Sequence, residues 1–329
     1  MPSMRQNMQD SIRQASGNSS RVEKATRLEF ITTVTSKFSA ACGLAALTLS
    51  TAAFAQAEDR YFDGAYISGA VGTKIVEDDA SDSIQFGTNR DGNFDNTVRT
   101  STGANAFAPG FCAGAPISAA NATCRGSRQT EGYAVRIGVD KQLGDSAFVF
   151  GALIEGARTG AQEFTTAYSS TPASYTFGRE MDWAVTARAR AGLAPGEGRA
   201  LFYGTGGAGY ARIKHSFQTS NGVNSCTPRN DRDWPLGWQA GGGTQVMLTR
   251  NLGLGIEYLY SSFKDDDYVV AVGPGTAPAT NPFLLDNAAG TDFRQSNDRF
   301  NFHTPCGTVA PIRAGRGADA PRRSIFTRQ

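Results

Sequence analysis

"EGYAVRIGVDKQLGDSAFVFGALIEGAR", residues 131–158, alternates between apolar and other side chains in two successive runs. One face of the first run is apolar and consists of Tyr133, Val135, Ile137 and Val139. Its opposite face carries Arg136 and Asp140, and in the second run Phe150 and Ile154 lie opposite Glu155. Alternation with a period of two is typical of a β-strand, because successive side chains point to opposite faces of a sheet. The stretch therefore predicts an antiparallel hairpin with the short turn "LGD".

Six further segments alternate in the same way, at residues 64–74, 182–194, 199–213, 235–248, 251–263 and 298–304. Short turns such as "PGEG" and "TRN" connect some of them, whereas residues 75–130, 159–179, 214–233 and 264–297 form long polar connections. Short turns on one side and long loops on the other are typical of outer-membrane barrels. We therefore expect an all-β fold, an eight-stranded antiparallel transmembrane β-barrel with long extracellular loops and short periplasmic turns.

These segments, with "SSTPASYTFGREMDW" (169–183) and "YGTGGAGYA" (203–211), resemble the eight-stranded outer-membrane proteins of Gram-negative bacteria over residues 60–303. The similar families are the OmpA-like barrel domains and the porin-like surface antigens of α-proteobacteria. The resemblance implies a porin-like surface or structural protein of the cell envelope, located in the outer membrane. Its implied partners are outer-membrane lipid, lipopolysaccharide and the barrel-assembly machinery. A narrow passive channel for small solutes is the alternative function, and a lipid-modifying enzyme is a third.

The N-terminal region has the pattern of a secretory signal. Residues 38–57 contain no charged side chain, follow Lys37, and end in two overlapping A-x-A sequences. This pattern predicts cleavage after Ala55 or Ala57. A permanent helical anchor is the alternative, since about 20 apolar residues can span a bilayer. We accordingly divide the chain into an N-terminal extension with its signal (1–57), a barrel (58–304) and a tail (305–329).

The charge distribution and the cysteine content indicate which classes of partner and which cell compartment the chain fits. The net charge of +2 comes from basic ends, and residues 38–303 hold 21 basic and 26 acidic side chains. A mildly acidic body is not a nucleic-acid surface. Because an exported chain passes an oxidising periplasm, we expect a disulfide between Cys112 and Cys124 in the first long loop. The sequence leaves the pairing of Cys226 and Cys306 open, together with the oligomeric state.

Charged side chains recur on the polar faces of the predicted strands. They are Arg136, Glu155, Arg188, Arg190 and Glu257. The interior of an eight-stranded barrel is just wide enough for side chains to fill it. We therefore expect an ion network that packs the lumen, with a gated narrow conduit and a catalytic carboxylate pair as the alternatives.

Other motifs lack the context that their chemistry requires. Gly204, Gly206 and Gly209 match a dinucleotide fingerprint, but no helix follows them. His215 and Ser216 are neighbours, so on a strand they point to opposite faces. The segment 89–96 begins like a calcium loop but lacks the glycine and glutamate such a loop needs. We expect no enzyme activity, no catalytic or metal-binding residues and no cofactor.

The end of the chain breaks the pattern. "DRFNFHT" (298–304) opens the eighth strand, and the following residues 305–329 contain Pro305, Pro311 and Pro321. Proline removes a donor from a strand ladder. The Arg-, Ala- and Gly-rich composition predicts a loose, basic tail. Our hypothesis is that a frameshift in a high-GC gene produced this segment, and the alternative is that the protein has a native basic extension. On this interpretation the barrel closes poorly against its first strand.

Overall fold

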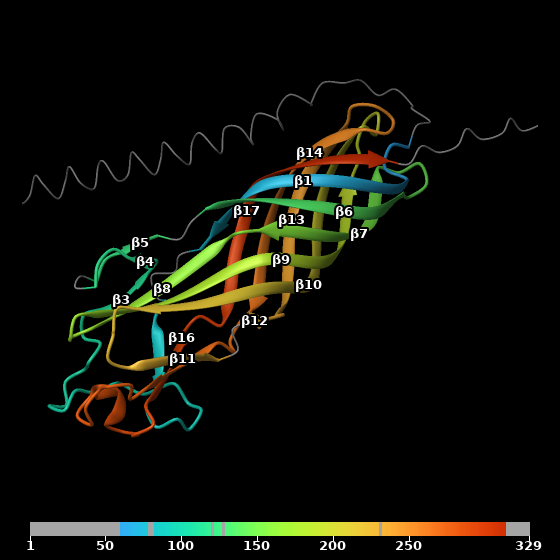
Figure 1. The fold of residues 1–329 in the computed structure, drawn as a ribbon. Coiled ribbons are helices and arrows are strands. Elements are labelled where there is room, and N and C mark those ends of the chain that lie inside the picture. The colour runs from blue at the N-terminus through green and yellow to red at the C-terminus, as the bar shows by residue number, and fades with distance from the viewer. Residues whose placement is uncertain (1–59, 78–81, 120–121, 127–128, 230–231, 314–329) are drawn as a thin grey trace, which may run out of the picture. The chain divides into compact units, whose positions relative to one another are not determined.

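The computed structural model describes residues 60–77, 82–119, 122–126, 129–229 and 232–313. Long strands lie side by side in Figure 1. In chain order they are β1 (Gly64–Val76), β6 (Thr130–Gln142), β7 (Phe148–Thr159), β9 (Ala173–Leu193), β10 (Ala200–Thr219), β13 (Leu236–Met247), β14 (Gly253–Lys264) and β17 (Arg299–Arg313). None of the helices in these described ranges is long and apolar enough to cross a bilayer.

The eight strands close into a barrel. Each pairs antiparallel with the next in chain order, from β1–β6 to β14–β17. The ring closes where β1 pairs with β17, from Tyr66 opposite Arg313 to Val76 opposite Phe302, and Figure 1 shows the blue β1 beside the red β17. The expected eight-stranded antiparallel barrel is confirmed. Closure leaves no strand edge in lipid, where an unpaired backbone group costs several kcal/mol.

Alternate side chains face outward and inward as the sequence indicates. Val185 and Tyr258 are about half exposed on the outer wall, whereas Arg188 and Glu257 are buried inside. The same alternation runs along β13, where Trp238 is exposed and Gln239 is buried. Side chains on the outer wall therefore form an apolar surface for lipid, and the charged ones fill the interior.

Glycines in β10 allow a close approach between neighbouring strands. A Cβ atom on Gly207 would lie 2.0 Å from the carbonyl oxygen of Ala187, and one on Gly209 would lie 2.1 Å from that of Val185. Both contacts are with the β9 backbone, so no side chain fits at these two positions. The glycine-rich motif therefore belongs to a barrel strand, as the missing helix indicates.

The expected boundary after Thr304 is wrong, because β17 continues to Arg313. Pro305 lies where the register shifts in both flanking ladders, between Thr304 and Gly307 against β14 and between His303 and Thr308 against β1. A proline at such a bulge removes no ladder bond. Beyond it Val309 and Arg313 are buried and Ile312 is exposed, so the alternation resumes. Residues 314–329 lie outside the described residues.

The long loops contain more strand than we expect from their polar composition. β9 and β10 continue beyond the barrel, where β8 (Gln162–Ser169) pairs with β9, β3 (Gly110–Ala113) with β8, and β12 (Arg232–Asp233) with β10. A separate sheet contains β11 (Ser225–Arg229), β15 (Val269–Gly273), β16 (Thr291–Gln295) and β2 (Ile84–Gly87). β4 (Ala115–Pro116) pairs with β5 (Cys124–Arg125), and Pro282–Leu284 form a 3₁₀ turn. We call these loop elements the cap.

The cap has its own hydrophobic core. Its aromatic side chains are Phe86, Phe107, Tyr175, Phe283 and Phe293, with ring centroids 4.5–6.1 Å apart. Phe86 and Phe293 are 207 positions apart in the sequence, so the core joins the first and last loops to the β9 extension. Aromatic pairs in such geometry are worth about 0.5–1.5 kcal/mol beyond their buried area. The loops therefore fold as one unit.

The expected disulfide between Cys112 and Cys124 is confirmed, and it joins β3 to β5 within the cap. Cys226 is a free, half-buried thiol. The predicted signal segment 1–57, with Ala55 and Ala57, lies outside the described residues and stays a prediction.

The outward position of Ile154 yields a first prediction. Ile154 lies midway along β7 and is 61% exposed, so Ile154→Arg places a charge at mid-bilayer depth. We expect it to lower the free energy of unfolding in lipid vesicles by about 2–4 kcal/mol. Val223→Arg is the matched control, since Val223 is 49% exposed in the cap, and there we expect less than about 0.5 kcal/mol. Equal losses in denaturant titrations would contradict the placement of β7 in lipid.

Candidate functional site

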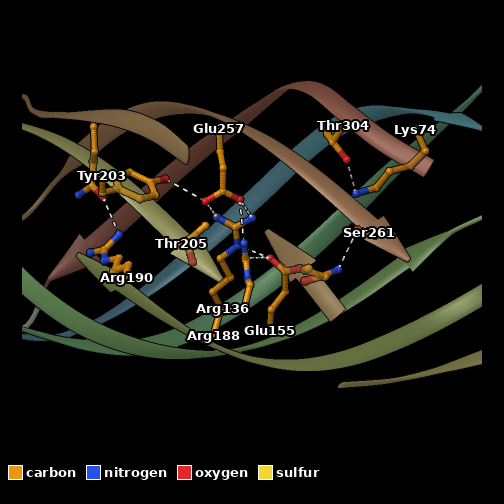
Figure 2. Close-up of polar contacts among 12 residues, drawn as sticks. Lys74, Arg136, Glu155, Arg188, Arg190, Tyr203, Thr205, Glu257, Ser261 and Thr304 are labelled. Carbon is orange, nitrogen blue, oxygen red and sulfur yellow. Dashed lines mark hydrogen bonds and ion pairs between the residues drawn. The ribbon is translucent and has the colours of Figure 1, made fainter. Parts of the chain in front are cut away.

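The five predicted charged residues all point into the barrel. Arg136 comes from β6, Glu155 from β7, Arg188 and Arg190 from β9, and Glu257 from β14. Each is at most 6% exposed. In Figure 2 the side chains of Arg136, Arg188, Glu155 and Glu257 meet, and Arg190 lies apart from them. The alternation places these side chains in the lumen, and the closure of the sheet brings them together.

Four of the five form one ionic cluster. The Arg136 guanidinium donates to Glu155 and, through Nη2, to Glu257 Oε1 at 2.7 Å. Arg188 bridges the same two carboxylates, with Nη2 2.7 Å from Glu155 Oε2 and Nη1 3.2 Å from Glu257 Oε1. The Tyr203 hydroxyl donates to Glu257 Oε2 at 2.9 Å. Each arginine therefore bridges both acids, which compensates for the cost of burying the charges.

Arg190 belongs to a second ionic group. Its Nε donates to Asp140 Oδ1 at 2.7 Å, and Arg313 of β17 forms an ion pair with the same carboxylate. The Arg190 guanidinium lies between two aromatic rings, 4.7 Å from the centroid of Tyr66 and 5.2 Å from that of Tyr203. The predicted network therefore divides into two groups.

Three residues of these groups are absent from the predicted network. Asp140 lies on the same polar face of its segment as Arg136, so the alternation predicts that it points into the lumen. Tyr203 lies in the glycine-rich strand, whose two faces both consist mainly of small residues. Arg313 follows Pro305 and Pro311 in a segment that the sequence predicts to be a loose tail. The predicted barrel therefore does not include it.

Apolar layers enclose the charged groups at both ends. On the turn side, Phe62, Leu201 and Met247 belong to one buried cluster. On the loop side, a second cluster from five strands fills the interior with Met181, Phe263, Phe300 and Phe302 among its members. Between the layers, a cavity of about 30 Å³ borders Lys74, Arg136 and Glu257. That volume holds one or two water molecules.

This arrangement restricts what the interior can do chemically. Each of the three carboxylates, Asp140, Glu155 and Glu257, is bound by two arginines. Guanidinium groups therefore occupy the oxygen atoms of all three carboxylates. The charged groups cross-link five strands of the barrel, and we assign them a structural role.

A second buried polar cluster lies between the cap and the strand extensions. Arg179 of β9 has Nε 2.8 Å from Gln295 Oε1 and 3.3 Å from Asp265 Oδ2, and Nη1 3.9 Å from Glu163 Oε2. His215 Nε2 lies 2.8 Å from Asp265 Oδ1. Arg179 thus joins the last loop to β8 and β9, which holds the cap against the barrel.

Glu163 in this cluster has a strongly perturbed pKa. Burial raises it to about 8 from an ordinary value of 4.5, the charge of Arg179 opposes the rise, and the nearby Asp82 carboxyl adds to it. A hydrogen bond joins the carboxyl groups of Glu163 and Asp82. Such a bond requires a proton on one of the two groups, so the pair holds a proton at neutral pH.

A closed, even-stranded barrel with an apolar outer wall and a charged interior defines the class of transmembrane outer-membrane barrels. Residues 42–277 match the family described as "Outer membrane protein beta-barrel domain". The chain belongs to this family, and its location is the outer membrane.

Curated relatives include the "31 kDa outer-membrane immunogenic protein" of Brucella melitensis biotype 1 and its counterpart in Brucella suis biovar 1. Each is 33% identical over 82 residues, which is 25% of this chain and 33% of the Brucella protein. The match thus spans a third of the length of these relatives. The matched family and relatives are described as outer-membrane proteins and not as enzymes.

Solved structures with a similar arrangement include the outer membrane protein OprG from Pseudomonas aeruginosa, with 13% identity and a TM-score of 0.40. The alignment covers 77% of this chain and 97% of OprG. Neisserial surface protein A is 9% identical with a TM-score of 0.29, and the alignment covers 77% of this chain and all of that one.

The ionic cluster yields a second prediction. Glu257→Gln leaves Arg136 and Arg188 with Glu155 as their shared carboxylate, and we expect a loss of about 3–5 kcal/mol in the free energy of unfolding. The double variant Arg188→Met, Glu257→Leu removes one charge of each sign and retains the Arg136–Glu155 pair. We expect it to be more stable than the single variant in urea titrations. A double variant that is less stable would contradict the pairing.

The raised pKa of Glu163 yields a third prediction. Between pH 4.5 and 8 the folded cap binds a proton that the unfolded chain has released, so raising the pH through this window lowers stability. From pH 5 to 8.5 we expect the free energy of unfolding of the cap to fall by on the order of 3 kcal/mol. Urea titrations that monitor the near-ultraviolet circular dichroism of the cap aromatics measure this change.

Glu163→Gln should remove most of this pH dependence and stabilise the cap at pH 8.5. The control is Glu197→Gln, since Glu197 is an exposed carboxylate in a turn and its loss should leave the pH profile unchanged. A Glu163→Gln variant that still loses stability as the parent does would show that another group binds the proton.

Proposed function

We propose that this chain is a non-conducting surface protein of the outer membrane, in which the barrel anchors and presents a rigid extracellular cap. The observation that carries the proposal is the pairing of a filled interior with a folded cap. A barrel that serves as an anchor needs no opening, and loops that serve as a display surface need a fixed shape. Transport through the barrel would need an open lumen and loops that leave its mouth accessible.

The interior supports this proposal. The two ionic groups and the two apolar layers occupy successive levels of the lumen. Moving an ion through the upper layer would require displacement of Phe263, Phe300 and Phe302, each at most 1% exposed. Side chains in close-packed interiors hold their positions, because few voids larger than a water molecule remain. A passive conduit for solutes is therefore the weaker candidate.

The folded cap at the extracellular end of the barrel also supports the proposal. Its aromatic core, the Cys112–Cys124 disulfide and the Arg179 cluster fix loops that the sequence suggests are polar connections. A cross-linked loop presents the same surface at all times, which lowers the entropic cost of recognition by a partner. The name of the Brucella relatives describes outer-membrane immunogenic proteins, and surface display of the cap agrees with that description.

The proposal includes no catalytic role. The His215 ring lies 4.5 Å from the Tyr268 ring in a stacked arrangement, and its Nε2 faces Asp265. Ser216 points to the opposite, exposed face of β10. A serine nucleophile needs a histidine within hydrogen-bond reach, and this pair of side chains diverges.

Planar-bilayer recording tests the proposal and is our fourth prediction. We expect the refolded full chain to produce no uniform conductance steps in 1 M KCl, at protein levels where a sixteen-stranded porin conducts, because such porins hold an aqueous channel and eight-stranded barrels are filled. Heat-modifiable migration of the same sample serves as the control for folding. Reproducible steps that scale with salt concentration would overturn the non-conducting assignment and favour the narrow channel.

A further inference from the structure

Three cations gather around one carboxylate on the outer wall of the barrel. Lys214 Nζ lies 2.8 Å from Asp182 Oδ2, Arg158 Nε lies 3.6 Å from Asp182 Oδ1, and Arg212 Nη1 lies 3.9 Å from Asp182 Oδ2. The cation side chains are 33–65% exposed. Asp182 lies where the β9–β10 register shifts and has no cross-strand partner on β10. We call Arg158, Arg212 and Lys214 the outer-wall basic cluster.

The cluster lies at the loop-side boundary of the lipid-facing band. Arg158 follows Phe148 by ten positions on the same face of β7, which is about 33 Å along the strand. A strand tilted by about 40° converts this to roughly 25 Å along the barrel axis. That height equals the apolar band of an outer-membrane barrel, about 25 Å. The outward residues between the two are Phe150, Ala152, Ile154 and Gly156.

Aromatic residues confirm the depth of the cluster. Trp183 is the cross-strand partner of both Arg158 and Arg212. Trp234 packs edge-on against Trp183 with ring centroids 4.6 Å apart, and Tyr133 lies opposite Arg158 on the neighbouring strand β6. Tryptophan and tyrosine favour the level of the lipid headgroups. The basic cluster is therefore at the height of the outer-leaflet headgroups.

Few acids lie beside the three cations of the cluster. Asp182 supplies one negative charge for three positive ones. Glu180 is the cross-strand partner of Lys214, and its carboxylate accepts a hydrogen bond from Gln162 Nε2 at 3.0 Å. Asp182 and Glu180 thus balance two of the three positive charges, and Glu131 lies two positions from Tyr133 on the same outward face of β6. Elsewhere on the wall, β13 and β14 present Trp238, Tyr258 and Tyr260, so the cations form a local site on β7 and β10.

We propose that the outer-wall basic cluster binds a phosphate group of the glycolipid that forms the outer leaflet. Arginine and lysine side chains are the usual ligands for phosphate, and the arginine fork donates two parallel hydrogen bonds to it. The apolar wall below Arg158 accommodates the acyl chains of the same molecule. The inference rests on the location of the chain in the outer membrane and is independent of whether the barrel conducts.

Native mass spectrometry of the refolded full chain tests this site. The probe is diphosphorylated lipid A, titrated against the parent protein and the variant Arg158→Gln, Arg212→Gln, Lys214→Gln. Each cation near an anionic lipid surface changes binding about fivefold, so we expect the triple variant to bind about 100-fold more weakly. The single variant Lys214→Gln should bind about fivefold more weakly, and it serves if the triple variant fails to show heat-modifiable migration.

The matched control is Arg60→Gln, Lys141→Gln, Arg199→Gln. These three exposed cations each pair with a carboxylate of their own and lie near the turn end of the barrel. We expect diphosphorylated lipid A to bind this control as tightly as it binds the parent. Dephosphorylated lipid A should bind the parent weakly, with the same affinity that diphosphorylated lipid A has for the triple variant. Unchanged binding by the cluster variants, or an equal loss in the control, would overturn the site. Displacement of lipid A by equimolar inorganic phosphate would assign the site to free phosphate instead.

Discussion

The pairing of every backbone N–H and C=O group is the constraint on which this structure depends, because the bilayer core offers no water to replace a missing partner. The eight strands meet it when β1 pairs with β17. Pro305 and Pro311 lack the backbone N–H donor that other residues of this strand supply. Pro305 lies in a bulge between ladder pairs. Pro311 lies opposite Ser68 of β1 and, on its other side, between the Gly255–Val309 pair and the Leu252–Ile312 bridge. The final strand therefore closes the ring with a sequence that lacks the usual strand composition.

Closure determines the character of the interior. A ring of eight strands leaves a lumen that side chains must fill, and alternation sends every second residue into it. Charged residues on those positions are tolerable only as pairs, since an uncompensated buried charge costs several kcal/mol. Arg136, Arg188, Glu155 and Glu257 satisfy each other across the barrel. The same contacts that neutralise the charges also cross-link the walls, so the polar interior is part of the stability of the barrel.

The two ends of the membrane-spanning part have different physical tasks. On the loop side, β9 and β10 extend past the lipid band and support a cap with its own aromatic core. Arg179 connects the last loop to this extension through Gln295 and Asp265. On the outer wall between band and cap, Arg158, Arg212 and Lys214 face the lipid headgroups. Anchoring, lipid contact and surface display are thus arranged in successive layers along the same strands.

The sequence by itself determined the barrel, because a period of two needs only local geometry and the lipid-facing alternation is visible in each strand. It also determined which way Arg136, Glu155, Arg188, Arg190 and Glu257 point, and the Cys112–Cys124 pair. Only the tertiary structure decided which of these charges meet, since contacts across a lumen join residues far apart in the sequence, such as Arg136 and Glu257 at 121 positions. It alone placed Arg313 against Asp140, because the bulge that accommodates Pro305 depends on β1 and β14. The cap also required the tertiary structure, because its core is assembled from loops whose individual segments carry no periodic signal.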